Sequence, residues 1–405
     1  MKKIFYYILA ISSCIIPGCG GCGHNTNTPA ATPSVCASSP APAASVQIDT
    51  EKLYQKAKEA QQSNDFEEAA ALYKKILEKN PNHHKARKRL GEIYYFTGEY
   101  EPAIREFKKA LEAKPPNAAA IKSNLVLCYL AVDRPESALP LIEKDLDEYS
   151  RWESHYSFLT QANYSLYMME KNQEKKKKII ETIKTELSEG IKETTIPYTK
   201  SMLKASLALF EGDRKKTSAE LGNALKEAQQ DRDRISILFL LGALEDENGN
   251  RKEALNFFRQ TVESAEKTDT LDPSNLMDGI YALWIYSYYE KKPMTIRNLD
   301  SITGQLRGGI REPETEVFAG KLKEYIAAHA NNNHTKALSL LKDIENSIMD
   351  ESIEGDYLYD GIYKPYILKF LYTLAAEESD KADKREMKAE YEKKLKQIKS
   401  GKFPY

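Results

Sequence analysis

The chain has 405 residues, of which 59 are Lys or Arg and 60 are Asp or Glu, so its formal net charge at pH 7 is -1. Nucleic-acid-binding proteins normally carry a basic excess on one face, and this balance argues against that class. Charged residues make up 29% of the chain while glycine is scarce, which favours a largely helical protein.

The first residues are typical of an export signal. Two lysines precede an apolar run over residues 4–16, and Cys19 follows a proline and a glycine. The run is shorter than a membrane-spanning helix requires. This arrangement resembles the lipobox of bacterial lipoproteins, which implies a signal peptide over 1–18 and lipid attachment at Cys19, with Cys14 as the alternative. An ordinary signal peptide or an uncleaved anchor is the other interpretation.

Residues 19–48 form a segment in which Gly, Asn, Thr, Pro, Ala and Ser predominate. Such a composition buries too little apolar surface to fold, so we expect a disordered tether between membrane and folded part. Cys19 and Cys22 have the spacing of a redox or haem motif. However, His24 does not directly follow the second cysteine, and neither function is predicted. Cys128 lies in an apolar stretch and is expected to be buried.

The chain repeats itself from residue 50 onward. A shift of 34 residues overlays 50–83 on 84–117 without a gap. The overlaid pairs are Phe66 with Tyr100, Ala69 with Ala103, Tyr73 with Phe107, Leu77 with Leu111 and Pro81 with Pro115. A match at this period indicates stacked helical hairpins.

The same spacing recurs at 235–268. Its offsets are shared by Gly91, Gly98, Ala103 and Phe107 in the earlier segment and by Gly242, Gly249, Ala254 and Phe258 in the later one. This pattern resembles the tetratricopeptide repeat (TPR) signature. The resemblance implies an all-α, TPR-like α-solenoid, with a repeat array over 49–268.

Each signature position has a physical reason. Small residues, among them Ala69, Ala103 and Gly91, occur where one helix approaches the next closely. Phe107 fills the space between repeats. Glycine at 98 and 249 is expected where the first helix ends, because a left-handed conformation is readily adopted by glycine.

Less regular hairpins are predicted for the rest of the chain. They cover 119–149, 151–188, 198–231, 275–309 and 314–349, and a charged capping helix ends the region 269–399. A break or bend is expected at 269–275. Tyr281, Trp284 and Tyr288 recur at helical spacing, which favours a buried core between helices.

A partner-binding groove follows from the resemblance, because the first helices of TPR hairpins line a concave surface. The residues implied are Tyr54, Lys58, Lys85, Arg89, Glu92, Tyr95 and Asn124. Lys58, Lys85 and Arg89 would form a basic spot suited to a carboxylate or phosphate. Ordinary solvated charges are the competing interpretation.

Enzyme motifs are not found: there is no phosphate-binding glycine loop, HExxH or nucleophile elbow. His329 and His334 flank a predicted turn and are expected to be exposed loop residues. The run 175–178 consists of four lysines, which predicts a solvated helix face or a contact with acidic lipid or an acidic partner.

We therefore predict a lipid-anchored scaffold or adaptor of the bacterial envelope, exported and facing the periplasm or the cell surface. It would bind a protein or peptide partner and the membrane, and no nucleic acid, cofactor or metal. The alternative is a protein that binds a small molecule or glycan in an aromatic-lined pocket at 281–289 or 357–372.

Overall fold

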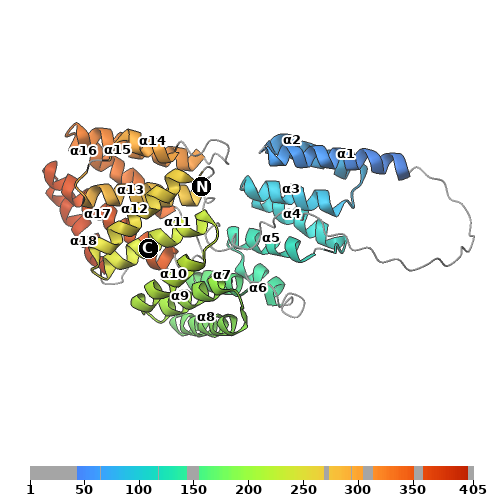
Figure 1. Cartoon of the computed structure of the whole chain (residues 1–405), viewed down its shortest axis with the longest axis horizontal. Helices are drawn as coiled ribbons and strands as arrows, with labels where there is room; N and C mark the ends of the chain where they lie inside the picture. The colour runs from blue at the N-terminus through green and yellow to red at the C-terminus, as the bar shows by residue number, and fades with distance from the viewer. Residues whose placement is uncertain are drawn as a thin grey trace, which may run out of the picture. The chain divides into compact units, whose positions relative to one another are not determined.

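The structure is a computed structural model that describes residues 43–63, 65–116, 118–143, 155–268, 273–292, 294–303, 313–350 and 359–399. These residues form eighteen α-helices and one short π-helix, with no strand among them, which confirms the predicted all-α class (Figure 1). The predicted signal peptide, Cys14, Cys19 and the tether up to residue 42 lie outside the described residues.

The chain divides into two compact units, with the boundary between Cys128 and Tyr129. The boundary expected after residue 268 does not separate them, since one hydrophobic core continues from Met202 to Ile398. This continuity arises because α11 and α12 both pack against α13.

The first unit consists of two hairpins and most of a further helix. Its helices are α1 (Ala43–Gln62), α2 (Phe66–Lys79), α3 (His84–Phe96), α4 (Tyr100–Glu112) and α5 (Ala118–Ala131). α1 packs on α2, α2 on α3, and α3 on α4. The helix α1 begins at Ala43, so residues 43–48 are helical instead of belonging to the expected tether. Pro42 directly precedes this start, and two alanines, the strongest helix formers, open the helix.

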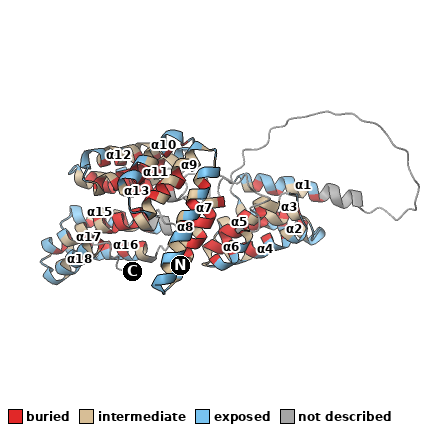
Figure 2. Ribbon diagram, turned by 90° about the horizontal axis from the view of Figure 1, so that it is seen from below, coloured by how far each residue is buried: buried red, intermediate tan, exposed pale blue. Residues whose placement is uncertain are grey.

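The second unit continues the hairpin pattern. Its helices are α6 (Pro135–Glu143), α7 (His155–Met169), α8 (Gln173–Glu193), α9 (Pro197–Phe210), α10 (Arg214–Glu227), α11 (Asp231–Glu247), α12 (Arg251–Lys267), α13 (Pro273–Tyr289), α14 (Ile296–Thr303), α15 (Pro313–Ala330), α16 (His334–Asp350), the π-helix Tyr359–Tyr363, α17 (Lys364–Lys381) and α18 (Arg385–Lys399). Buried residues follow the sides where helices meet, and exposed residues cover the outer sides (Figure 2). The hairpins expected at 151–188, 198–231, 275–309 and 314–349 correspond to consecutive helix pairs.

One turn geometry recurs between paired helices. Among the described residues, the residue at the turn has a positive φ in seven hairpins: Gly98, Asp133, Gly212, Gly249, Lys291, Asn332 and Asp383. In each, the next backbone N–H donates to a carbonyl five residues earlier, as Asn250 N does to Glu245 O (2.8 Å) and Lys292 N to Ser287 O (3.0 Å). These bonds satisfy carbonyls that a helix end leaves open. The turn position is therefore more regular in structure than in sequence, where glycine occupies only three of the seven.

The signature glycines allow close helix approach. A Cβ added to Gly91 would lie 2.7 Å from Phe107 Cε1, and one added to Gly242 would lie 2.7 Å from Phe258 Cε1. Carbon atoms in good contact are about 3.5–4.0 Å apart, so no side chain fits at either glycine. Both phenylalanines are buried. The two segments thus share a packing device as well as a spacing.

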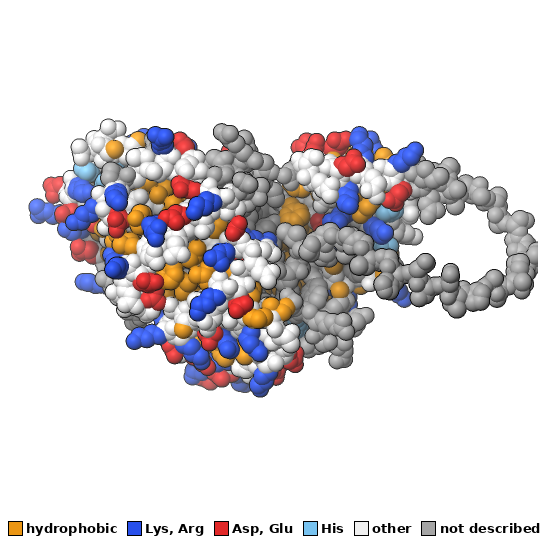
Figure 3. Space-filling view, viewed as in Figure 1, with side chains coloured by type: hydrophobic (Ala, Val, Ile, Leu, Met, Phe, Trp, Pro, Cys, Tyr) orange, Lys and Arg blue, Asp and Glu red, His pale blue; other side chains and the backbone are white. Residues whose placement is uncertain are grey.

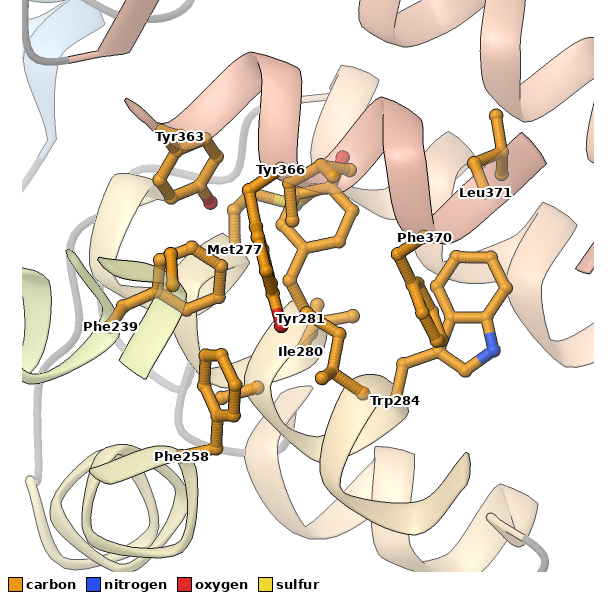
Figure 4. Close-up of a cluster of buried hydrophobic side chains, with 14 of the residues drawn as sticks. Phe239, Phe258, Met277, Ile280, Tyr281, Trp284, Tyr363, Tyr366, Phe370 and Leu371 are labelled. Carbon is orange, nitrogen blue, oxygen red and sulfur yellow. The ribbon is translucent and has the colours of Figure 1, made fainter. Parts of the chain in front are cut away.

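Aromatic side chains fill the centre of the second unit. Tyr363 approaches Phe239 with ring centroids 4.6 Å apart, and Phe370 approaches Trp284 at 5.3 Å. Figure 4 shows these rings in one cluster, with Phe239 from α11, Trp284 from α13, Tyr363 from the π-helix before α17, and Phe370 from α17 itself. Tyr281 and Trp284 are 2% and 4% exposed, so these two rings belong to the core, as predicted, whereas Tyr288 is only partly buried.

Candidate functional site

The predicted partner-binding residues lie on the first helices of the hairpins in the first unit. Tyr54 and Lys58 are in α1, whereas Lys85 and Arg89 are in α3. The two lysines are exposed and Tyr54 and Arg89 are partly buried. No ion pair of Lys58 or Lys85 occurs within the ranges that the structure describes.

Glu92 organises the centre of this face. Its carboxylate accepts from Lys88 Nζ at 2.5 Å and from Arg89 Nη1 at 2.9 Å. Asn124 Nδ2 lies 3.5 Å from Glu92 Oε1, at the outer limit of a hydrogen bond. Arg89 is therefore already paired with Glu92. The face remains basic because Lys58 and Lys85 are exposed, and because two cations, Lys88 and Arg89, share the single carboxylate of Glu92. Lys88 was not among the predicted groove residues; its position four residues before Glu92 was the available signal.

Arg89 is held in place by its neighbours. Burial alone would lower the pKa of its guanidinium, but Glu92 and Tyr54 raise that pKa above the ordinary value. The ring of Tyr54 lies 5.8 Å from that of Tyr73 and 5.6 Å from that of His83. A charged arginine beside an ordered aromatic ring is a preorganised donor, since little side-chain freedom remains to be lost on binding.

His83 caps α3. Ala86 N donates to His83 Nδ1 at 3.1 Å, so the ring stands where a serine or aspartate usually caps a helix. Burial lowers the pKa of His83, which favours the neutral ring that accepts this bond. His83 thus lies between the first two hairpins and fixes the start of α3.

Tyr95 belongs to a different part of the same unit. Its ring lies 5.8 Å from that of Phe96 and 5.7 Å from that of Tyr100, and Phe96 stacks on Phe66 at 6.4 Å. These four aromatic residues form a cluster at the turn end of the hairpins. The predicted groove residues are therefore not one contiguous set: Tyr54, Arg89, Glu92 and Asn124 come together, and Tyr95 packs at the turn.

The expectation of two exposed loop residues at 329 and 334 holds only in part. The His329 side chain is 46% exposed, as expected, whereas His334 is partly buried, and both residues lie at helix ends instead of in a loop. His329 Nδ1 and His334 Nδ1 each lie 2.8 Å from a different oxygen of Glu378. The Glu378 side chain is 2% exposed, and that of His334 is 20% exposed. The sequence concealed this cluster because its carboxylate lies more than forty residues away, in α17. Among the described residues no group of His, Cys, Asp and Glu is arranged to hold a metal ion.

A second buried carboxylate joins the hairpin α11–α12 to α17. Tyr366 OH donates to Asp246 Oδ2 at 2.8 Å, and Arg251 Nε pairs with the other oxygen of the same carboxylate. The Arg251 guanidinium lies 3.8 Å from the centroid of the Tyr289 ring. Burial and the Asp246 carboxylate raise the pKa of Tyr366, so its hydroxyl stays a donor.

The alternative of an aromatic-lined pocket loses support, because the rings expected to line it pack against one another. A hollow does lie along α8, with Glu174, Lys177, Lys178 and Glu181 on its rim. It is open to solvent and is lined by residues of one helix. Its lining is therefore that of a solvated helix surface.

Comparison with known families addresses the N-terminal repeats directly. Residues 60–123 match the family model described as tetratricopeptide repeat. The chain contains tetratricopeptide repeats. The matched segment covers α2, α3 and α4, and it includes the contact of Gly91 with Phe107. TPR proteins are typically non-enzymatic interaction scaffolds.

Solved TPR structures resemble the chain as well. A thermophilic TPR protein of Thermus thermophilus is 22% identical, with 50% of this chain and 99% of that chain covered and a TM-score of 0.42. The TPR domain of P58(IPK) is 15% identical, with 86% of this chain and 99% of that chain covered and a TM-score of 0.28. No curated protein matches the sequence. Among the described helices, none has the length and apolar character needed to cross a membrane.

Proposed function

We propose that this TPR protein is a lipid-anchored scaffold of the bacterial cell envelope, and that it binds a protein partner through the first helices of its N-terminal repeats. The observation that carries the proposal is the face around Glu92. There Arg89 is held beside Tyr54, and Lys58 and Lys85 are exposed on the same set of first helices. Peptides and partner helices commonly bind this side of TPR arrays.

The chemistry of the face favours an acidic partner segment. Glu92 contacts two cations, Lys88 and Arg89, so positive charge exceeds negative charge around it. Arginine presents paired N–H donors that match a carboxylate, and the exposed lysines add longer-range attraction. An acidic peptide or a chain terminus would thus meet both directional donors and a favourable field.

The lipid anchor completes the proposal. Attachment at Cys19, or at Cys14, would hold the repeats at the membrane through a tether that ends where α1 begins, at Ala43. Two or more acyl chains give stable membrane attachment. Labelling cells with a palmitate analogue tests this part: label should be lost in Cys19→Ala, or in Cys14→Ala if that cysteine is modified. Absence of label in the parent protein would refute the anchor.

The partner is tested by crosslinking in intact envelopes followed by mass spectrometry. The test variant combines Lys58→Glu with Arg89→Glu. Its matched control combines Lys75→Glu with Lys109→Glu, which changes the same charge at exposed residues of the second helices α2 and α4. We expect one envelope protein to be crosslinked by the parent and the control, and lost from the test variant. Equal loss from both variants, or equal retention in both, would refute the assignment of this face.

A further inference from the structure

The α7–α8 hairpin has an exposed tip that the scaffold function does not use. α7 ends at Met169 and α8 begins at Gln173. The helices run antiparallel, since Asn163 Nδ2 donates to Glu186 Oε1 (2.8 Å) and Tyr156 OH donates to Glu193 Oε2 (2.6 Å). The last turn of α7 and the first turns of α8 therefore meet at one end of the hairpin.

Apolar surface is exposed at this tip. Met168 and Met169 are 41% and 51% exposed, and Val317 is the other large apolar residue with comparable exposure among the described residues. Two adjacent exposed methionines leave flexible apolar side chains in water. Methionine adapts its shape readily and is common on binding surfaces that must accommodate an irregular partner.

Positive charge surrounds the methionines. Residues 167–178 contain five lysines and two glutamates, a surplus of three positive charges. Lys171, Lys175, Lys177 and Lys178 are exposed, and Lys176 Nζ lies 4.6 Å from the centroid of the Tyr167 ring. Lysine and carboxylate side chains crowd the surface over α8 at the lower edge of Figure 3.

Helix stability does not explain these lysines. The first turns of a helix carry the positive end of its dipole, where cations are unfavourable and anions are favourable. Four consecutive lysines begin three residues after the Asn172 cap of α8. Two carboxylates lie beside these lysines and do not offset all of their charge. Glu174 Oε1 pairs with Lys177 Nζ at 3.1 Å. Glu170 accepts the backbone N–H groups of Lys171 and Asn172 at 2.8 Å and lies 3.8 Å from Lys175 Nζ.

We propose that the tip formed by residues 167–178 docks on an anionic lipid bilayer, with Met168 and Met169 inserted among the headgroups and the lysines facing lipid phosphates. The pairing of exposed apolar side chains with a lysine cluster matches such a surface in both respects. A purely acidic protein would satisfy the charges and leave the methionines unused. This docking does not depend on acylation of Cys19, and it would orient the second unit at the membrane.

Hydrogen exchange of the full chain, with and without vesicles, tests the proposal. Cys14→Ser and Cys19→Ser remove both candidate acylation sites, so no acyl chain contributes. We expect vesicles of phosphatidylcholine with one quarter phosphatidylglycerol to slow exchange in residues 167–178, and pure phosphatidylcholine vesicles to leave it unchanged. Each lysine near an anionic surface contributes about fivefold to binding.

Two variants and a control separate the contributions. Lys177→Glu with Lys178→Glu should weaken binding to the anionic vesicles at least tenfold, and Lys75→Glu with Lys109→Glu, of equal charge, should not. Met168→Ser with Met169→Ser should weaken it about tenfold, because exposed apolar surface no longer leaves water. Protection that is absent from 167–178, or that survives the methionine change in full, would overturn the proposal. The latter result would indicate binding of any polyanion, such as an acidic protein.

Discussion

Adding one methyl group at Gly242 should destabilise the second unit. In Gly242→Ala the new Cβ would lie 2.7 Å from Phe258 Cε1 and 2.8 Å from Cδ1. Ordinary contact distances of about 3.5–4.0 Å require the ring or the helix to move by about 1 Å. The ring has little room to move, since its centroid lies 5.5 Å from that of Phe239 and 5.9 Å from that of Tyr366.

The expected size follows from two opposing effects. Overpacking a well-packed core costs about 1–3 kcal/mol. Replacing glycine by alanine inside a helix favours folding by about 1 kcal/mol. The free energy of unfolding of Gly242→Ala should therefore fall by up to about 2 kcal/mol. The matched control is Gly320→Ala in α15, where an added Cβ meets nothing within 4 Å. The control should be as stable as the parent or more stable.

Thermal unfolding followed by circular dichroism measures the difference, and hydrogen exchange of α11 and α12 shows where it acts. A second variant, Gly242→Ala with Phe258→Leu, removes the ring atoms that the methyl group contacts. Its loss of stability should be smaller than the sum of the two single losses. If Gly242→Ala is no less stable than Gly320→Ala, or if the two changes are additive, the packing explanation for the signature glycine is refuted.

Three further changes probe the turns and the buried carboxylates. Lys291→Gly should stabilise the protein by about 1 kcal/mol in thermal unfolding, because Lys291 has a φ of 56°, a left-handed conformation that glycine adopts without strain. The control Asn332→Gly should have little effect, since asparagine tolerates this conformation. Burial alone would raise the pKa of Glu378, but hydrogen bonds from His334 and His329 lower that pKa below the ordinary value. The ionised Glu378 therefore stabilises the folded protein above the pKa of an unfolded glutamate, which is about 4.3. This stabilisation is lost as the pH falls through the lower pKa of Glu378 in the folded protein. Glu378→Gln should lower the free energy of unfolding at pH 7 by about 1–3 kcal/mol and flatten its decline below pH 4, as followed by urea unfolding across pH. Asp246→Asn should cost a similar 1–3 kcal/mol in urea unfolding at pH 7, because the acceptor shared by Tyr366 and Arg251 is weakened.

The regular repeats were predictable because spacing and packing coincide in them. Gly91 lies opposite Phe107 and Gly242 lies opposite Phe258. The same steric requirement, a residue without a side chain facing a phenylalanine ring, therefore gives the same residue types at the same spacing. Such a requirement can be read from one sequence, since few residues satisfy it. The predicted buried positions Ala69 and Ala103 are likewise fully buried.

The later repeats are harder to identify because other residues satisfy the same backbone. Seven residues before the turn, where the clear repeats have glycine, the later hairpins have Trp284 and Tyr325. The centroids of these two rings lie 5.5 Å apart. The rings fill the space between helices at the position where the clear repeats have glycine and a close helix approach. At the turn itself, lysine and aspartate adopt the left-handed conformation that glycine adopts elsewhere. The backbone geometry of the turn is the same in these hairpins, although the signature residues are replaced by others.

Polar contacts between distant segments could not be predicted. Glu378 meets two histidines, and Asp246 meets Tyr366, across separations in sequence that no periodicity marks. The sequence did place Tyr54, Arg89, Glu92 and Asn124 on successive first helices, because repeat register alone determines that placement. The spacings of Lys88 and Arg89 to Glu92 allow ion pairs, but whether each pair forms depends on side-chain rotamers.

The two units differ in what their first helices leave available for a partner. In the second unit, Phe239 of α11 and Trp284 of α13 pack against Tyr363 and against Phe370 of α17, so the chain itself occupies those side chains. In the first unit, the corresponding helices α1 and α3 present exposed lysines and a half-buried arginine. A ligand could reach the aromatic face only by displacing α17, whose hydrophobic side chains are mostly buried. Partner binding on the first unit requires no such rearrangement, which is why the charge reversals there are the sharper test of function.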